Sequence, residues 1–192
     1  MATKETLAKY ILKKVKMSED DLAQILSHFK PRTVKKKEIL LHEGGLSNKM
    51  YFVVKGCLRI YFIKDVGTEV TRRIIFENDS SASMVSFITQ NPSNEYIEAV
   101  MDSELLIMDR KDFYRLVETL PVWEKFYRHQ LEYAYVVNTN RLMSFITNDA
   151  TERYLQLLKE NPEIINRLPN RLVANYLNIT QEGLSRLKSK LT

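Results

Sequence analysis

The chain has 192 residues, 44% of them hydrophobic, with only five glycines and five prolines, which excludes a disordered chain and predicts one or two folded domains. A single cysteine, Cys57, excludes an internal disulfide framework and any cysteine-rich zinc or iron–sulfur site, and three scattered histidines predict no metal site. The formal net charge is +5, with basic ends at residues 1–40 and 167–192 and an acidic middle. No segment approaches the roughly 18 apolar residues of a membrane span, and the N-terminus lacks a signal peptide's apolar run, so we expect a cytoplasmic protein without a membrane partner.

Two helices are predicted before Pro31: an amphipathic TLAKYILKKV, and SEDDLAQILSHFK, which begins at a Ser18 cap. From residue 33 to residue 77 the chain is rich in β-type runs, namely EILL, MYFVV, CLRIYFI and VTRRIIF, and YIEAVMD and ELLIMD follow. Lys55-Gly56 lies inside one long run and predicts a tight reversal or bulge. Short strands with no helices between them indicate an antiparallel sandwich or roll.

Helical periodicity returns at Arg110 and continues to the end of the chain. RKDFYRLVETL predicts one helix, and residues 121–147 predict a second that is about 40 Å long. Two neighbouring rows run along this long helix: Phe126, Gln130, Tyr133, Val137, Asn140 and Ser144, and Tyr127, Leu131, Ala134, Asn138, Arg141 and Phe145. Such a seam suits pairing with a second helix as well as packing on the β domain, and its length favours dimerisation for its second half. Thr147-Asn148-Asp149 predicts a hinge before the helix ATERYLQLLKE.

The segment LPNRLVANYLNITQEGLSRLKSKLT predicts a helix-turn-helix motif. Asn170 is a candidate cap for the first helix, Asn178 suits the left-handed turn, and Thr180 is a candidate cap for the second helix. The small side chain of Ala174, four residues before the turn, permits a close helix crossing. The apolar residues expected to face inward are Val173, Leu177, Leu184, Leu187 and Leu191.

The opposite face of the second helix carries side chains suited to DNA. Arginine recognises guanine, glutamine recognises adenine, glutamate accepts a hydrogen bond from the amino group of cytosine, and lysine contacts phosphate. The predicted DNA-binding residues are Thr180, Gln181, Glu182, Ser185, Arg186, Lys188, Ser189 and Lys190. Residues 167–192 hold five Lys and Arg against one Asp or Glu, which also favours a polyanionic partner. The alternative is a packed helical pair with a solvated face.

The segment RLVANYLNITQEGLSRLKSKL resembles the recognition end of Crp/Fnr-type bacterial transcription regulators, whose second helix carries a Glu and an Arg four residues apart, as Glu182 and Arg186 do here. EGGLSNKMYFVVKGCLRIYFI resembles the early strands of that family's cyclic-nucleotide-binding-like β-roll. The resemblance covers residues 20–192. It implies an α+β protein with a roll-shaped sensor domain and N-terminal helices at 1–120, a dimerisation helix and hinge at 121–147, and a DNA-binding domain at 148–192. It also implies a homodimer on a two-fold symmetric operator, with RNA polymerase as a further candidate partner.

Three departures from the family pattern limit what the resemblance implies. Where nucleotide-binding members carry a Gly-Glu-Leu-Gly run and an Arg-Ser pair, this chain has Ala82-Ser83-Met84-Val85 and Ser93-Asn94. Ser83, Met84, Val85, Ser93 and Asn94 are therefore candidate effector-pocket residues, but residues 74–109 hold no Lys or Arg and seven Asp and Glu, so we expect no cyclic AMP. The N-terminus offers no cysteine for an oxygen-sensing cluster. Because the chain stops at Thr192, we also expect no full β-hairpin wing after the second helix.

The leading hypothesis is thus a homodimeric, sequence-specific transcription regulator without a cofactor, which either senses another molecule or holds a fixed conformation. A ligand-binding or protein-interaction module of the same fold that has lost DNA binding is the alternative. An enzyme is not expected, because the sequence contains no GxSxG, GxxxxGK[ST] or HExxH motif and no Cys–His setting.

Overall fold

The computed structural model describes residues 2–64 and 67–191. The chain forms two compact units, which we call the N-terminal unit (Met1–Ile60 with Ile74–Glu132) and the C-terminal unit (Tyr61–Arg73 with Tyr133–Thr192). Each unit is described by itself below. Among the described residues, no helix combines the length and apolar character needed to cross a membrane.

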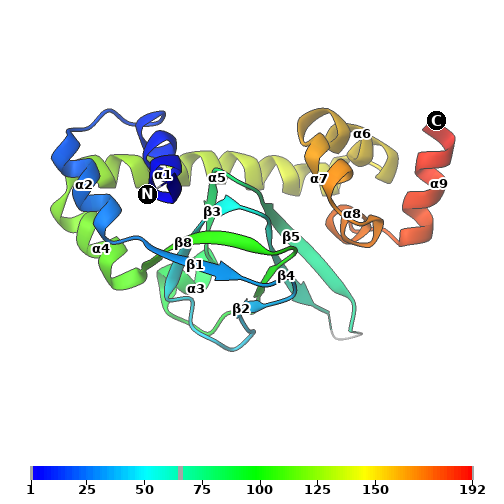
Figure 1. Ribbon diagram of the computed structural model, residues 1–192. Coiled ribbons are helices and arrows are strands. Elements are labelled where there is room, and N and C mark those ends of the chain that lie inside the picture. Colours follow the sequence, from blue (N-terminus) through cyan, green and yellow to red (C-terminus); the bar gives the residue numbers. More distant parts are fainter. Residues whose placement is uncertain (1, 65–66, 192) are drawn as a thin grey trace. The chain divides into compact units, whose positions relative to one another are not determined.

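Two four-stranded sheets form the roll (Figure 1). One has the order β1 (Lys30–Val34), β8 (Ser103–Asp109), β3 (Lys49–Lys55) and β6 (Asp79–Ser81). The other has the order β2 (Ile39–Leu41), β7 (Tyr96–Ala99), β4 (Leu58–Ile63) and β5 (Glu69–Ile75). The pairings β1–β8, β3–β8, β3–β6 and β2–β7 are antiparallel, which confirms the antiparallel roll predicted from the sequence.

The central strands β3 and β8 have apolar residues on both faces. On β3, Met50 and Phe52 point to one apolar cluster while Tyr51 and Val53 point to another. Successive side chains of a strand alternate between faces, so a strand that is apolar at every position is covered on both sides. The strand β8 divides between the same two clusters: Leu106 and Met108 belong to the first, Leu105 and Ile107 to the second.

The first cluster lies against helices. It is covered by α1 (Ala2–Leu12), α2 (Glu19–Ser27), α4 (Arg110–Thr119) and the start of α5 (Pro121–Thr147), which gather beside this sheet (Figure 1). The ring of Phe113 meets that of Trp123 edge-on at 5.5 Å between centroids, and Trp123 stacks on Phe126 at 5.0 Å. Ser18 caps α2 by accepting a hydrogen bond from the Asp21 amide at 3.1 Å, as predicted.

The C-terminal unit is helical apart from the strand residues at 61–63 and 69–73. Its helices are the second half of α5, α6 (Ala150–Glu160), α7 (Pro162–Arg167), α8 (Asn170–Leu177) and α9 (Gln181–Leu191). Asp149 precedes α6 and caps it with a capping box: the Asp149 carboxylate accepts from the Glu152 amide, and the Glu152 carboxylate accepts from the Asp149 amide. The break predicted at residues 147–149 is therefore confirmed.

Two details of the predicted motif were wrong. Asn170 is not a helix cap: α8 already includes it, Pro169 precedes it, and its side-chain oxygen accepts a 2.7 Å hydrogen bond from Lys188 Nζ. Leu191 does not face the interior, since 46% of it is exposed.

Gly56 forms the turn predicted at Lys55-Gly56, where the chain leaves β3 in one sheet and enters β4 in the other. Its φ is +105°, a conformation that glycine adopts without strain and that residues with a side chain adopt only at a cost in energy. A Cβ at this position would lie 2.2 Å from Ser103 Oγ, and the Gly56 amide donates to the Glu77 carboxylate at 2.8 Å. The turn is thus held by backbone conformation, close packing and a hydrogen bond together.

Gly56→Ala is expected to lower the free energy of unfolding by about 2–4 kcal/mol, because left-handed strain adds to steric overlap with Ser103. Gly44→Ala is the matched control, since its φ is +80° but nothing lies within 4 Å of the added Cβ. The control should lose only about 1–2 kcal/mol. Urea unfolding of both variants measures the difference, and equal losses would contradict the packing argument.

Candidate nucleic-acid interface

The turn between α8 and α9 has the geometry of a helix-turn-helix. Asn178 adopts φ 53° and ψ 48°, the left-handed conformation predicted for it. The Ile179 amide donates to the Ala174 carbonyl at 3.0 Å, which closes a Schellman motif at the end of α8. Thr180 Oγ1 accepts from the Gly183 amide at 3.0 Å, so Thr180 caps α9 as expected.

Small and apolar side chains hold the two helices together. Val173, Ala174 and Leu177 of α8 are buried, and Leu184 of α9 is completely buried against them. Leu187, which was also expected to face inward, is only partly buried. One face of α9 is therefore fixed by packing, which leaves its other face to solvent.

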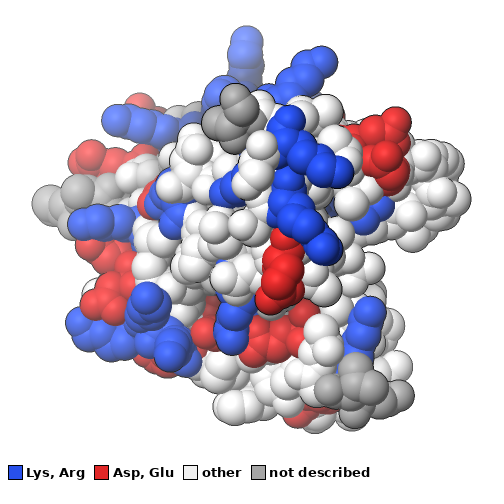
Figure 2. Space-filling model, turned by 90° about the vertical axis from the view of Figure 1, so that its right-hand side faces the viewer, with Lys and Arg blue, Asp and Glu red and all other residues white. Residues whose placement is uncertain are grey.

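The predicted DNA-binding residues all lie on α9 or at its cap, and most are exposed. The exposed ones are Thr180, Gln181, Glu182, Ser185, Arg186, Ser189 and Lys190. Lys188 is half-buried and ties α9 to α8 through Asn170. Among the described residues, neither Arg186 nor Lys190 forms an ion pair with the protein, so both cations are available to an external anion. Figure 2 shows one face of the molecule, with basic side chains gathered in its upper part and in a second group at its lower left.

The five predicted effector-pocket residues separate into two groups. Ser83 and Ser93 are buried and come together, with 2.9 Å between their hydroxyl oxygens, and Ser83 Oγ also donates to the buried Glu95 carboxylate at 2.8 Å. Met84 is partly buried on α3 (Met84–Thr89). Val85 is 71% exposed and Asn94 is exposed, so these two point away from the roll's interior. Ser83 and Ser93 thus already have hydrogen-bond partners within the protein.

A buried ion pair joins β4 and β7, which are neighbours in the second sheet. Arg59 on β4 and Glu98 on β7 are almost fully buried, and Arg59 Nε donates to Glu98 Oε2 at 2.9 Å. The sequence analysis counted seven acids and no cation in residues 74–109 and missed this arginine, because it comes from the neighbouring strand. The signal was an arginine in the middle of the apolar run CLRIYFI, where a charged side chain is buried only with a partner.

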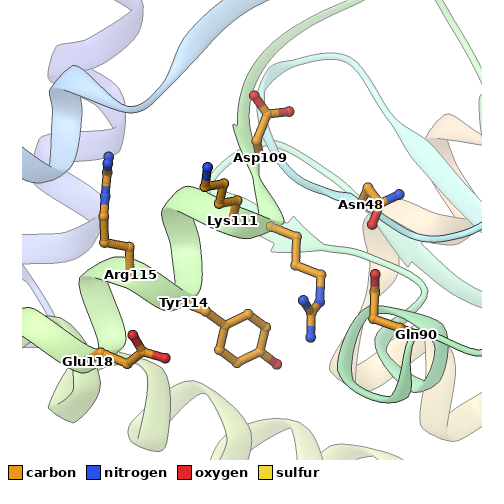
Figure 3. A pocket seen from close by; sticks show the side chains of 8 residues that line it. Asn48, Gln90, Asp109, Lys111, Tyr114, Arg115 and Glu118 are labelled. Atoms are coloured by element: carbon orange, nitrogen blue, oxygen red, sulfur yellow. The ribbon is translucent and has the colours of Figure 1, made fainter.

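A cavity of about 650 Å³ lies elsewhere in the N-terminal unit and was not predicted. It is lined by Asn48, Gln90, Asp109, Arg110, Lys111, Tyr114, Arg115 and Glu118. In Figure 3, Asn48 and Gln90 lie on one side, and Arg115 and Glu118 on the other. Arg110 donates to the Phe87 carbonyl and lies 4.5 Å from the centroid of the Tyr114 ring, so its charge is already engaged.

The second half of α5 exposes an apolar surface. Its exposed apolar residues are Leu131, Tyr133, Tyr135, Val136, Val137, Leu142, Met143 and Ile146. This surface coincides only in part with the rows read from the sequence, because Arg141 and Phe145 of the second row pack inside the C-terminal unit. Among the described residues, no three His, Cys, Asp or Glu side chains are grouped as metal ligands.

Comparisons with known proteins agree with this geometry. Residues 31–120 match the cyclic nucleotide-binding domain family. A cyclic AMP receptor protein of Thermus thermophilus is 29% identical over 104 residues, which span 54% of this chain and about half (47%) of that relative. The c-di-GMP-responsive global regulator CLP of Xanthomonas campestris has a similar structure, with a TM-score of 0.73, 18% identity and 91% of each chain covered. FixK2 of Bradyrhizobium japonicum superposes with a TM-score of 0.69 and 19% identity over 85% of this chain and 84% of its own.

Arg59→Met alone is expected to lower the free energy of unfolding by about 3–5 kcal/mol, because it leaves the Glu98 carboxylate buried without its cation. The double variant Arg59→Met, Glu98→Leu should recover most of that loss, since an apolar pair of similar volume carries no desolvation cost. Chemical unfolding of the two variants and the wild type tests this. A double variant no more stable than the single one would contradict the ion-pair argument.

Proposed function

We propose that the chain is a sequence-specific DNA-binding regulator and not an enzyme, because residues 31–120 match the cyclic nucleotide-binding domain family and the fold is that of Crp/Fnr-type transcription regulators. The observation that supports this most directly is the exposed polar and basic face of α9. This helix follows a turn in which Asn178 has the left-handed conformation that a helix-turn-helix requires. A role on bacterial DNA implies that the protein acts in the cytoplasm, with RNA polymerase as a candidate partner.

In this proposal α9 is the recognition helix. Arg186 reads a guanine through a bidentate contact, and Glu182, one turn earlier, accepts from a cytosine amino group. Gln181 and Ser185 supply further contacts to base edges. Lys188, Ser189 and Lys190, with the N-terminus of α9 at Thr180, contact phosphates, which position the helix without reading sequence.

We propose further that the regulator is a homodimer. The exposed apolar surface of α5 would be costly for a monomer in water, and a second copy of the same helix is its natural cover. A two-fold symmetric dimer presents two α9 helices, and these match a two-fold symmetric operator.

The roll is proposed not to bind a cyclic nucleotide. A phosphate in a protein interior needs a cation or a set of free amide donors. In the roll, the buried Arg59 is already paired with Glu98, and the buried Glu95 carboxylate already accepts a hydrogen bond from Ser83. The protein then either responds to another molecule or binds DNA in one fixed conformation.

Selection from random duplex DNA with the ligand-free protein at moderate salt tests the proposed function. Recovery of a two-fold symmetric site would support a dimeric regulator, and adding cyclic AMP should leave both the recovered site and its yield unchanged. Recovery of no site from folded protein, with and without an extract of small cellular molecules, would contradict DNA recognition.

Arg186→Ala is expected to weaken binding to the selected site by about 1–3 kcal/mol and to relax preference at a single base pair, because it removes a bidentate base contact. Lys190→Ala, a matched basic residue on the same helix, should weaken binding to all sequences alike and lower the salt slope by about one. Fluorescence anisotropy over a range of salt concentrations measures both. The assigned roles are wrong if Arg186→Ala loses as much affinity for random DNA as for the site.

Val136→Asp is expected to convert the dimer to a monomer, because it places a charge in the middle of the apolar surface of α5. Leu155→Asp is the control, since Leu155 on α6 is an apolar residue of similar exposure, 44% against 54%, outside that surface. Sedimentation velocity gives the mass of each variant, and circular dichroism checks the fold. A Val136→Asp variant that stays dimeric would contradict the proposed interface.

A further inference from the structure

The C-terminal carbonyls of α8 have an unusual set of partners. The last four carbonyls of a helix find no amide donor within the helix and need hydrogen-bond donors from elsewhere. Those of Ala174 and Asn175 accept from the backbone of the turn, through the Ile179 and Asn178 amides. Those of Tyr176 and Leu177 instead accept from arginine side chains outside the motif.

Arg141 is the first of these arginines. It lies on α5, its Nη2 donates to the Tyr176 carbonyl at 2.7 Å, and the same nitrogen reaches the Thr71 carbonyl on β5 at 3.2 Å. Its guanidinium carbon lies 3.6 Å from the centroid of the Tyr176 ring and 5.1 Å from that of Phe145. One side chain therefore joins three elements of the C-terminal unit.

Arg153 is the second. It lies on α6, its Nη1 donates to the Asn148 carbonyl at 2.7 Å, and its Nη2 approaches the Leu177 carbonyl at 3.4 Å. Its guanidinium stands 5.1 Å from the ring of Phe145, the same ring that Arg141 contacts. Asn148 is the residue that follows α5, so Arg153 joins the end of α8 to the break between α5 and α6.

This arrangement carries an electrostatic cost that the rest of the structure offsets. Burial lowers the pKa of Arg141, and the nearby cations Arg72 and Arg153 lower it further. The negative end of the α8 dipole and the faces of two aromatic rings are the groups that favour a positive charge at this place. A lysine ammonium has no planar face to stack on the Tyr176 ring, so it cannot replace this guanidinium.

We propose that Arg141 and Arg153 are positioning residues for DNA binding, forming a guanidinium clamp that closes on the C-terminus of α8 and fixes the helix-turn-helix to α5 and β5. The inference rests on the proposed function, because it assigns to the clamp the orientation of α9. An ion pair at 3.5 Å between the exposed Arg171 on α8 and the partly buried Glu69 on β5 joins two of the same elements and serves as the internal comparison.

The clamp can be tested without DNA. Spin labels on Thr139→Cys of α5 and Ser189→Cys of α9 report the distance between these helices, and both positions are exposed whereas Cys57 is fully buried. Labelled protein is mixed with excess unlabelled protein, so that a dimer carries one labelled subunit. Arg141→Lys and Arg141→Ala should broaden the distance distribution, whereas Arg171→Ala should leave it as in the wild type. An unchanged distribution in Arg141→Lys overturns the proposal, and this variant decides the matter if Arg141→Ala does not fold.

A second measurement links the clamp to DNA. Two joined half-sites gain roughly 10²–10⁴-fold in affinity only when both recognition helices engage at once, so a loosened helix loses part of that gain. Arg141→Lys should therefore bind the two-half-site operator about tenfold more weakly and tolerate altered half-site spacing, with base preference inside each half-site retained. A spacing preference as strict as that of the wild type overturns the proposal. A wild-type protein that binds no DNA refutes the proposed function instead, and the distance measurement still decides whether the clamp exists.

Discussion

The two-sided burial of β3 and β8 is the constraint on which the N-terminal unit depends. Each strand sends alternate side chains into two apolar clusters, one between the sheets and one beneath the helices α1, α2, α4 and α5. A shift of one residue in the pairing of these strands would exchange the two sets, so their register must be strictly defined. The turn at Gly56 contributes to this definition, because it ends β3 where the chain crosses to the second sheet. The position of the first half of α5 follows, since Trp123 and Phe126 pack on the same cluster.

Local rules predicted the helices and the motif well. The ends of α5 and α6 coincide with residues 121–147 and 150–160 because Pro121, the Asp149 cap and Pro162 mark them chemically. Asn178 and Thr180 behave as expected for the same reason. The strand β1 was missed, since KPRTV is polar, exposed along four of its five residues and held by its pairing with β8. The strand β6 and the helix α7 are too short for a periodic signal.

The candidate sites were less predictable because they depend on contacts between distant residues. The pairing of Arg59 with Glu98 joins residues of two strands that lie 39 positions apart in the sequence, and a count along one segment cannot detect it. The arginines at the end of α8 come from α5 and α6. Their partners are backbone carbonyls, which every residue has, so the sequence does not reveal these contacts. By contrast, the exposed face of α9 was predictable, since the buried Leu184 determines which side of the helix faces the interior and which residues remain outside.

The pairing of β1 also has a consequence for the order in which the chain can fold during synthesis. β1 lies at the edge of its sheet and its one partner there is β8, whose first residue is translated about seventy residues later. Throughout that interval β1 has no partner and faces solvent on the nascent chain. Its lysine, proline and arginine make it a poor template for pairing with another chain, because proline removes a donor and charges repel a neighbouring edge. The polar character that hid this strand from sequence analysis thus protects the unfinished protein from aggregation while the ribosome completes the sheet.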